Sequence, residues 1–103
     1  MAEQQTKEKG IPITDFPMYS VHSDGRVWSE YQYRFLNQKT MLNGYVMLRL
    51  TGKNKHERHA VHRLVARHFL PNPDNSIDIL HINGNKRDNR VENLRWVTDR
   101  ILI

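Results

Sequence analysis

The chain has 103 residues and a mass of 12.3 kDa, a length that allows a single domain. Lysine and arginine number 16 against 11 aspartates and glutamates, which gives a net charge of +5 and a pI near 9.8. Such an excess indicates a polyanionic partner, and nucleic acid is the first candidate. Mean hydropathy is −0.75, and no stretch approaches the roughly 20 apolar residues of a spanning helix, so we expect no membrane contact.

The opening residues carry no targeting signal. Residues 1–9 are polar apart from Met1 and Ala2, so we expect a disordered tail and a cytoplasmic protein. Cysteine is absent, which excludes disulfides and thiolate zinc sites and leaves His, Asp, Glu and Asn as ligands. We expect no small-molecule substrate.

Three turn signals divide the first half of the chain into short strands. They are Ser23-Asp24-Gly25, Leu42-Asn43-Gly44-Tyr45 and Gly52-Lys53-Asn54-Lys55. Between the last two, Val46, Leu48 and Leu50 alternate with other residues as in a strand with one buried face. We therefore expect one small antiparallel sheet in this half.

The pattern changes after residue 60. Four apolar residues share one helical face, namely Val61, Leu64, Val65 and Phe69. This spacing predicts a helix over 60–69, which Pro71 ends. Residues 77–82 then predict a short strand and 91–97 a return segment. Thr98 is placed to cap a final helix, but few residues follow it, so we expect that helix to be truncated.

The most informative stretch is HINGNKRDNRVENLRWVT, residues 81–98. Together with VHRLVA at 61–66, it resembles the HNH endonucleases of the phage and intron homing type. The segment YSVHSDGRVWS at 19–29 resembles the small N-terminal module often fused to those enzymes.

This resemblance implies an α+β fold with a small antiparallel N-terminal sheet, one central helix and a ββα-metal hairpin. Within a single domain over 10–103, it implies an N-terminal β module over 10–52 and an HNH core over 53–103.

The same resemblance implies the residues of a catalytic centre. His81 matches the general base, a role that suits an imidazole because its ordinary pKa near 6.5 lets it hold and release a proton at neutral pH. Asn93 matches the asparagine that orients this histidine, and Asn85 and Asn89 match polar positions that shape the turn. In the family, a divalent cation stabilises charge on the scissile phosphate.

The metal ligands of the family are not matched. The residue before the base is Leu80, where the family has Asp or Asn, and the second ligand position falls at Leu102. Neither leucine offers a lone pair, and Mg²⁺ needs oxygen ligands. We therefore expect no cofactor, with Mg²⁺ or Mn²⁺ required if the chain is active. Asp78 and Asp99 remain as alternative ligands, although strand alternation places Asp78 on the face opposite His81.

Basic residues form two groups in the second half of the chain. We predict DNA contacts from nine of them: Arg49, Lys53, Lys55, Arg58, Arg63, Arg67, Lys86, Arg87 and Arg90. The alternative is a solvated charged face. His56, His59 and His62 recur at intervals of three, and solvated histidines are favoured there over a structural zinc site because the usual fourth ligand is missing.

These observations favour an HNH-like protein of phage type that has lost cleavage and acts by binding. It would occupy DNA, or dock on a nucleic-acid-bound protein complex such as a host defence nuclease and inhibit it. The alternative is an active metal-dependent HNH nicking endonuclease that uses His81 and Asn93. A third hypothesis is a fragment or accessory subunit completed by a partner chain.

Overall fold

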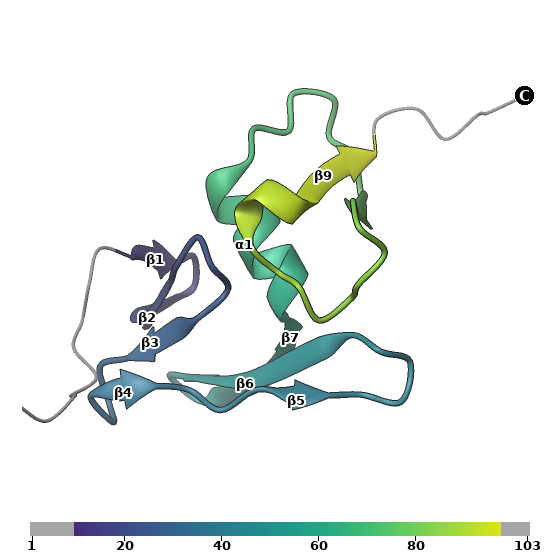
Figure 1. The fold of residues 1–103 in the computed structure, drawn as a ribbon. Helices are drawn as coiled ribbons and strands as arrows, with labels where there is room; N and C mark the ends of the chain where they lie inside the picture. The colour runs from purple at the N-terminus through teal and green to yellow at the C-terminus, as the bar shows by residue number, and fades with distance from the viewer. Residues whose placement is uncertain (1–9, 98–103) are drawn as a thin grey trace, which may run out of the picture.

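The computed structural model describes residues 10–97, which form two antiparallel sheets, one α-helix and a hairpin (Figure 1). The tail predicted over 1–9 and the helix predicted after residue 98 lie outside the described residues. The first sheet has the order β1 (Ile11–Ile13), β2 (Phe16–Val21), β3 (Val27–Ser29) and β4 (Arg34–Phe35). Its predicted hairpin is confirmed, because Val21 pairs with Val27 across the Ser23-Asp24-Gly25 turn.

The second sheet has the order β5 (Lys39–Thr40), β6 (Val46–Gly52) and β7 (Lys55–Ala60). Both predicted turns are present, because Thr40 pairs with Val46 and Gly52 pairs with Lys55. Along β6 the buried residues are Val46, Leu48 and Leu50, which confirms the predicted alternation.

One expectation differs from the structure, since the first half of the chain folds as two sheets rather than one. The second sheet also includes β7, whose sequence KHERHA has no apolar alternation because it is a largely exposed edge strand. The predicted division at residues 52 and 53 falls within the turn of the β6–β7 hairpin, so these two strands lie on either side of it.

Helix α1 (Val61–Phe69) follows β7 directly and confirms the predicted helix. Val61, Leu64 and Val65 are fully buried, whereas the arginines of the helix are exposed. The helix ends where Leu70 takes extended backbone, because a residue that precedes proline disfavours the helical conformation.

A hairpin completes the described chain. It consists of β8 (Asp78–His81) and β9 (Leu94–Val97), joined by a long turn that ends in the 3₁₀ helix η1 (Val91–Asn93). His81 lies opposite Leu94, and both are buried. The neighbouring residue Leu80 points to the other face and is 42% exposed.

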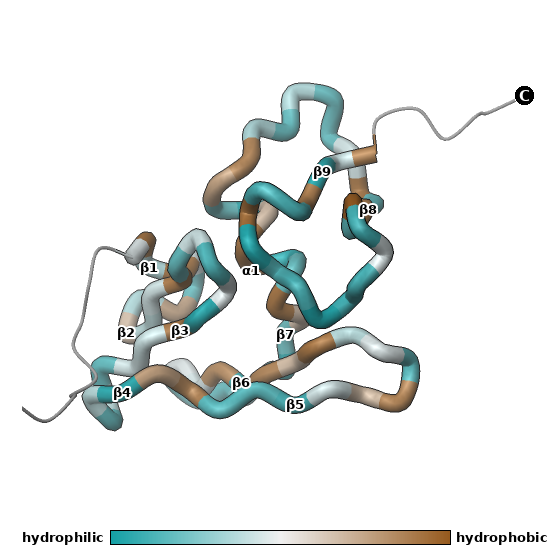
Figure 2. The backbone as a smooth tube through the Cα atoms, viewed as in Figure 1, coloured by the Kyte–Doolittle hydropathy of each residue, from teal (hydrophilic) through white to brown (hydrophobic). Residues whose placement is uncertain are grey.

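One apolar core lies where the two sheets meet α1 and β9. It comprises Ile13, Phe16, Tyr19, Val21, Val27, Val46, Leu48, Leu50, Val61, Leu64, Val65 and Leu94. In Figure 2 the turn after β8 is hydrophilic over most of its length, in contrast to these core segments. Within residues 10–97 no helix is both long and apolar enough to cross a membrane.

Hydrogen bonds from backbone N–H groups join the N-terminal sheet to the rest of the fold, among them one from Thr14 to His68 Nε2 on α1 at 3.1 Å. The Thr51 N–H donates to Tyr19 Oη at 3.3 Å, and the Val91 N–H donates to the Ser23 carbonyl at 2.7 Å. The first sheet is thereby fixed both to β6 and to the turn that precedes β9.

Candidate functional site

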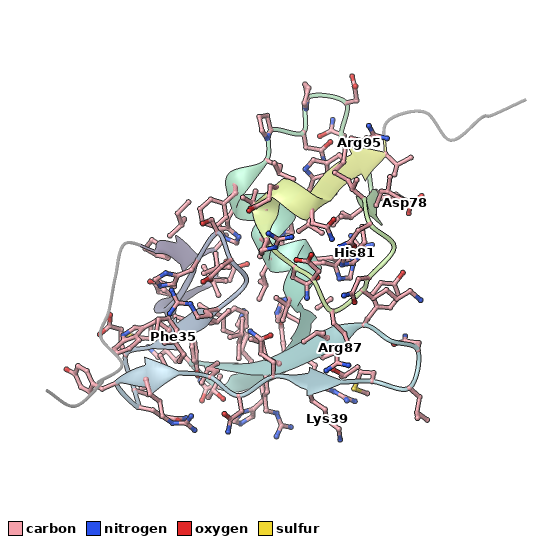
Figure 3. The ribbon with its side chains drawn as sticks, viewed as in Figure 1. Phe35, Lys39, Asp78, His81, Arg87 and Arg95 are labelled. Atoms are coloured by element: carbon pink, nitrogen blue, oxygen red, sulfur yellow. The ribbon has the colours of Figure 1, made fainter. Side chains whose placement is uncertain are left out.

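His81, the last residue of β8, has its imidazole packed toward α1 and only 6% of its surface exposed (Figure 3). Its Nε2 lies 2.7 Å from Oδ1 of the buried Asn89. Because an amide oxygen only accepts hydrogen bonds, Nε2 carries the proton and Nδ1 keeps the lone pair. The ring is therefore held in one tautomer, with its basic nitrogen at Nδ1.

Asn93 contacts the turn rather than the imidazole. Its Oδ1 accepts the Asn83 N–H at 3.0 Å, and its Nδ2 donates to Asn83 Oδ1 at 3.0 Å and to the Asp88 carbonyl at 2.9 Å. The side chain bonded to His81 is thus Asn89, where the sequence had suggested Asn93. The turn folds back on itself. Asn93 therefore joins the two ends of the turn, and Asn89 lies close enough to bond to the His81 ring.

Two further rings pack beside His81. The Tyr45 and His62 rings are stacked with centroids 4.9 Å apart, and the His62 and His81 centroids are 5.1 Å apart. His62 therefore lies beside His81 and is buried, so the expectation of a solvated histidine was wrong at this position because residue 62 lies on the buried face of α1. Tyr45 comes from the β5–β6 turn and was missed as a site residue, because nothing local in the sequence brings residues 45, 62 and 81 together.

The His62 imidazole is neutral at pH 7. Burial is the largest cause and, together with the electrostatic influence of His81 and Arg63, lowers its pKa from 6.5 to about 4. Only 7% of this residue is exposed, and its Nδ1 has no hydrogen-bond partner among residues 10–97.

Lys86 joins the turn after β8 to the β5–β6 turn. Its Nζ donates to the Asn43 carbonyl at 3.0 Å and lies 4.4 Å from the centre of the Tyr45 ring. Gly44 allows this approach, because a Cβ at this position would lie 3.1 Å from Lys86 Cδ. Lys86, predicted to contact DNA, is therefore engaged within the protein.

Two hollows flank the end of the β5–β6 hairpin. The histidine hollow, of about 410 Å³, is lined by Asn43, Tyr45, Met47, Ala60, His62, Arg63, Asp78 and Ile79. The cationic hollow, of about 390 Å³, is lined by Asn37, Lys39, Met41, Met47, Leu48, Arg49 and Arg58. Met47 lines both hollows, and Asp78 reaches the histidine hollow although it alternates with His81 along β8.

The cationic hollow brings together like charges. Arg49 on β6 is directly opposite Arg58 on β7, and Lys39 on β5 lies beside them in the same hollow. All three are exposed, and within residues 10–97 no acidic side chain forms an ion pair with them. Like charges directly opposite each other in a sheet repel, so this face is arranged for an anionic partner.

Cations in the turn after β8 are arranged differently. Arg90 binds Asp88 through Nε–Oδ1 at 2.8 Å and Nη2–Oδ2 at 2.9 Å. These hydrogen bonds lower the pKa of Asp88 to about 2 and raise that of Arg90. Arg87 is exposed. Of the three cations predicted to contact DNA from this turn, two are thus engaged internally.

The remaining predicted cations are Lys53 in the β6–β7 turn, Lys55 at the start of β7, and Arg63 and Arg67 on α1. All four are exposed, and Lys55 Nζ lies 4.7 Å from the centre of the Phe16 ring. Among the nine predicted cations, only Arg49 and Arg58 lie directly opposite each other in a sheet.

The three histidines spaced by three have separate partners. His56 Nδ1 lies 3.2 Å from Thr51 Oγ1, His59 Nε2 lies 2.9 Å from Glu57 Oε1, and His62 stacks on Tyr45. Over residues 10–97 no group of three or more His, Asp or Glu side chains is placed to hold a metal ion.

Residues 59–102 match the family model described as HNH endonuclease. The chain is therefore related to the HNH endonucleases, and its relatives include proteins named as homing endonucleases. It is 33% identical over 94 residues to "Uncharacterized HNH endonuclease L245" of Acanthamoeba polyphaga mimivirus, covering 91% of this chain and 28% of that protein. It is 36% identical over 83 residues to "DNA endonuclease I-HmuI" of Bacillus phage SP01, covering 81% of this chain and 48% of that protein.

The fold agrees with this relationship. A solved structure described as "DNA binding and cleavage by the HNH homing endonuclease I-HmuI" matches with a TM-score of 0.82 and 33% identity, covering 88% of this chain and 53% of that one. The expected α+β architecture is thus confirmed. The chain spans about half or less of the length of these relatives.

Within residues 10–97 no group of side chains is arranged to hold the divalent cation that the family implies. The resemblance places Leu80 at a ligand position, and a leucine side chain offers no donor atom to a cation. The second such position, Leu102, lies outside the described residues. The described residues therefore do not fit this cation.

Proposed function

We propose that this chain binds duplex DNA through the cationic hollow and does not cleave it. The observation that carries this proposal is the opposition of Arg49 and Arg58, exposed and without an acidic partner within residues 10–97. Their mutual repulsion is relieved when phosphates lie against them, and each phosphate contact releases condensed counterions. Arg63, Arg67 and Arg87 add exposed positive charge.

The absence of cleavage is inferred from Leu80. His81 retains a defined tautomer, so the general base is supported, but the adjacent position supplies no ligand. Proton transfer by a base contributes only part of the catalysis of phosphodiester cleavage, and charge stabilisation by a cation contributes several kcal/mol more.

A plasmid-nicking assay tests this proposal. The chain, the His81→Ala variant and the double variant Leu80→Asp with Leu102→Asn are incubated with supercoiled plasmid and Mg²⁺ or Mn²⁺. We expect no nicking by the unaltered chain above the His81→Ala level, and metal-dependent nicking by the double variant. Nicking by the unaltered chain that disappears in His81→Ala would instead establish an active nuclease.

An active nuclease is the second candidate, because the arrangement of His81, Asn89 and the surrounding turn is intact. A cation held at Asp78 in the histidine hollow would be required. The variant Asp78→Asn separates the two candidates, since it abolishes nicking only if that carboxylate is a ligand.

Docking on a nucleic-acid-bound protein complex, with inhibition of that complex, is the third candidate. Ile77, Leu80 and Ile82 are 65%, 42% and 55% exposed around β8, and they provide an apolar surface for such a contact. This candidate predicts stable co-purification with a protein complex and no affinity for bare duplex at about 150 mM salt. Salt-sensitive duplex binding favours DNA occupancy instead.

A further inference from the structure

Leu42, at the end of the β5–β6 hairpin, is the most exposed large apolar residue within residues 10–97. Its side chain has 108% of the reference exposure, so it contacts essentially nothing in the protein. A single exposed leucine is ordinary on a protein surface, so its importance depends on how it is held and what lies beside it.

The backbone around Leu42 is firmly held. The Gly44 N–H donates to the Met41 carbonyl at 2.9 Å, and the Met41 N–H donates to the Tyr45 carbonyl at 2.8 Å. Asn43 Oδ1 accepts the Tyr45 N–H at 3.1 Å, and Lys86 holds the Asn43 carbonyl from the neighbouring turn. An apolar side chain on such a rigid turn loses little backbone entropy on binding.

Leu42 also lies between the two hollows. Its neighbour Met41 lines the cationic hollow, and its other neighbour Asn43 lines the histidine hollow. In Figure 3 Lys39 projects from the lower face of the second sheet, whereas His81 lies above that sheet. The second sheet lies between them, and the end of its β5–β6 hairpin combines a hydrophobic stretch with hydrophilic ones in Figure 2. A nucleic acid that contacts both hollows must therefore pass this end.

We propose that Leu42 inserts into a groove of the bound duplex and wedges between two stacked base pairs. This inference rests on the proposed DNA binding and specifies how the duplex is deformed. Cations of the adjacent hollow hold the phosphates, and the leucine enters the groove between them, where base pairs present apolar stacking surfaces. Apolar side chains inserted in this way unstack a base step and kink the duplex.

The inference is tested with two duplexes of the same sequence, one fully paired and one with a single central mismatch. A mismatch lowers the cost of unstacking, so a protein that inserts a wedge binds the mismatched duplex more tightly. We expect a preference of about tenfold for the unaltered chain, measured by fluorescence anisotropy, and less than about twofold for Leu42→Ala. The fluorescence of 2-aminopurine beside the mismatch rises on binding the unaltered chain and rises less with Leu42→Ala.

Leu42→Met and Met18→Ala are the matched controls. Methionine is also a large apolar side chain, so Leu42→Met retains the preference. Met18→Ala removes an exposed apolar residue of β2 that lines neither hollow, and it leaves the preference unchanged. If Leu42→Ala matches the unaltered chain in both measurements while duplex binding remains salt-dependent, the insertion is wrong and DNA binding stands. If the unaltered chain binds neither duplex, the proposed function fails and the insertion fails with it.

Discussion

The turn after β8 and the cationic hollow are both rich in polar and charged residues, yet they use them in opposite ways. In the turn, Asn83, Asn89 and Asn93 bond to other groups of the protein, and Arg90 is bound by Asp88. In the hollow, Arg49 and Arg58 oppose each other without an acidic partner within the described residues. The first region stabilises the protein from within, and the second is stabilised only by an external anion.

Removing the amide of Asn93 tests the internal half of this comparison and has the largest expected effect. Asn93→Ala deletes three hydrogen bonds of a buried side chain and leaves part-buried groups of Asn83 and Asp88 unpaired, so we expect a loss of about 3 kcal/mol in the free energy of unfolding, measured by urea denaturation. Asn85→Ala, at an exposed position with one backbone contact, is the control and should cost less than about 1 kcal/mol. Equal losses would contradict the central role of Asn93.

Low pH should reduce the free energy of unfolding through His62, which packs between Tyr45 and His81. The pKa of His62 is about 4 in the folded chain and 6.5 in the reference state, so the unfolded chain binds a proton first as pH falls. The stability contributed by neutral His62 is complete above pH 6.5 and is lost as pH falls toward 4. Because solvent reaches one side of the ring through the hollow, we expect a loss on the order of 2 kcal/mol.

The variant His62→Phe isolates this effect. Phenylalanine keeps a ring beside Tyr45 but cannot bind a proton, so the difference in unfolding free energy between the two chains should change between pH 7 and pH 4.5. A difference that is constant over this range would show that His62 is not the titrating group.

Removing the opposed arginines tests the external half of the comparison. The double variant Arg49→Ala with Arg58→Ala should lower the slope of log affinity against log salt by about 2, since each phosphate contact contributes roughly 0.9. Its unfolding free energy should stay the same or rise slightly, because the cross-strand repulsion is removed. An unchanged salt slope would place the DNA-binding surface elsewhere.

The smallest expected effect is that of replacing Lys86, which we expect to contribute to stability and not to DNA binding. Because its ammonium is bound to Asn43 and Tyr45, Lys86→Met should leave the salt slope unchanged and lower the unfolding free energy by about 1 kcal/mol. A fall in the salt slope without a loss of stability would show that Lys86 contacts phosphate, as the sequence alone had suggested.

Much of the fold was predictable because its signals are local. The turns at Gly25, Gly44 and Gly52 and the apolar face of the helix around Leu64 each depend on a few neighbouring residues. The division into two sheets was not predictable, because β7 is an exposed edge strand whose residues have no apolar period. Its place is set by pairing with β6.

Only those residues of the candidate site that belong to a sequence motif could be predicted. The motif predicts His81 and Asn93 as site residues, and the nicking assay tests the role of His81. It could not show that Asn89 is the residue bonded to the ring, or that Tyr45 and His62 pack beside it. Those contacts join segments far apart in the chain, and only the folded core brings them together.

The outward orientation of Leu80 has a consequence for how this family diversifies. Leu80 belongs neither to the buried apolar core nor to the hydrogen-bonded asparagines of the turn, so we expect its replacement to change the free energy of unfolding little. Under the proposed function, a chain that cuts and a chain that only binds would therefore share one backbone and nearly one free energy of unfolding. Substitutions at residue 80 could then be selected for their effect on DNA cleavage, without a cost in stability.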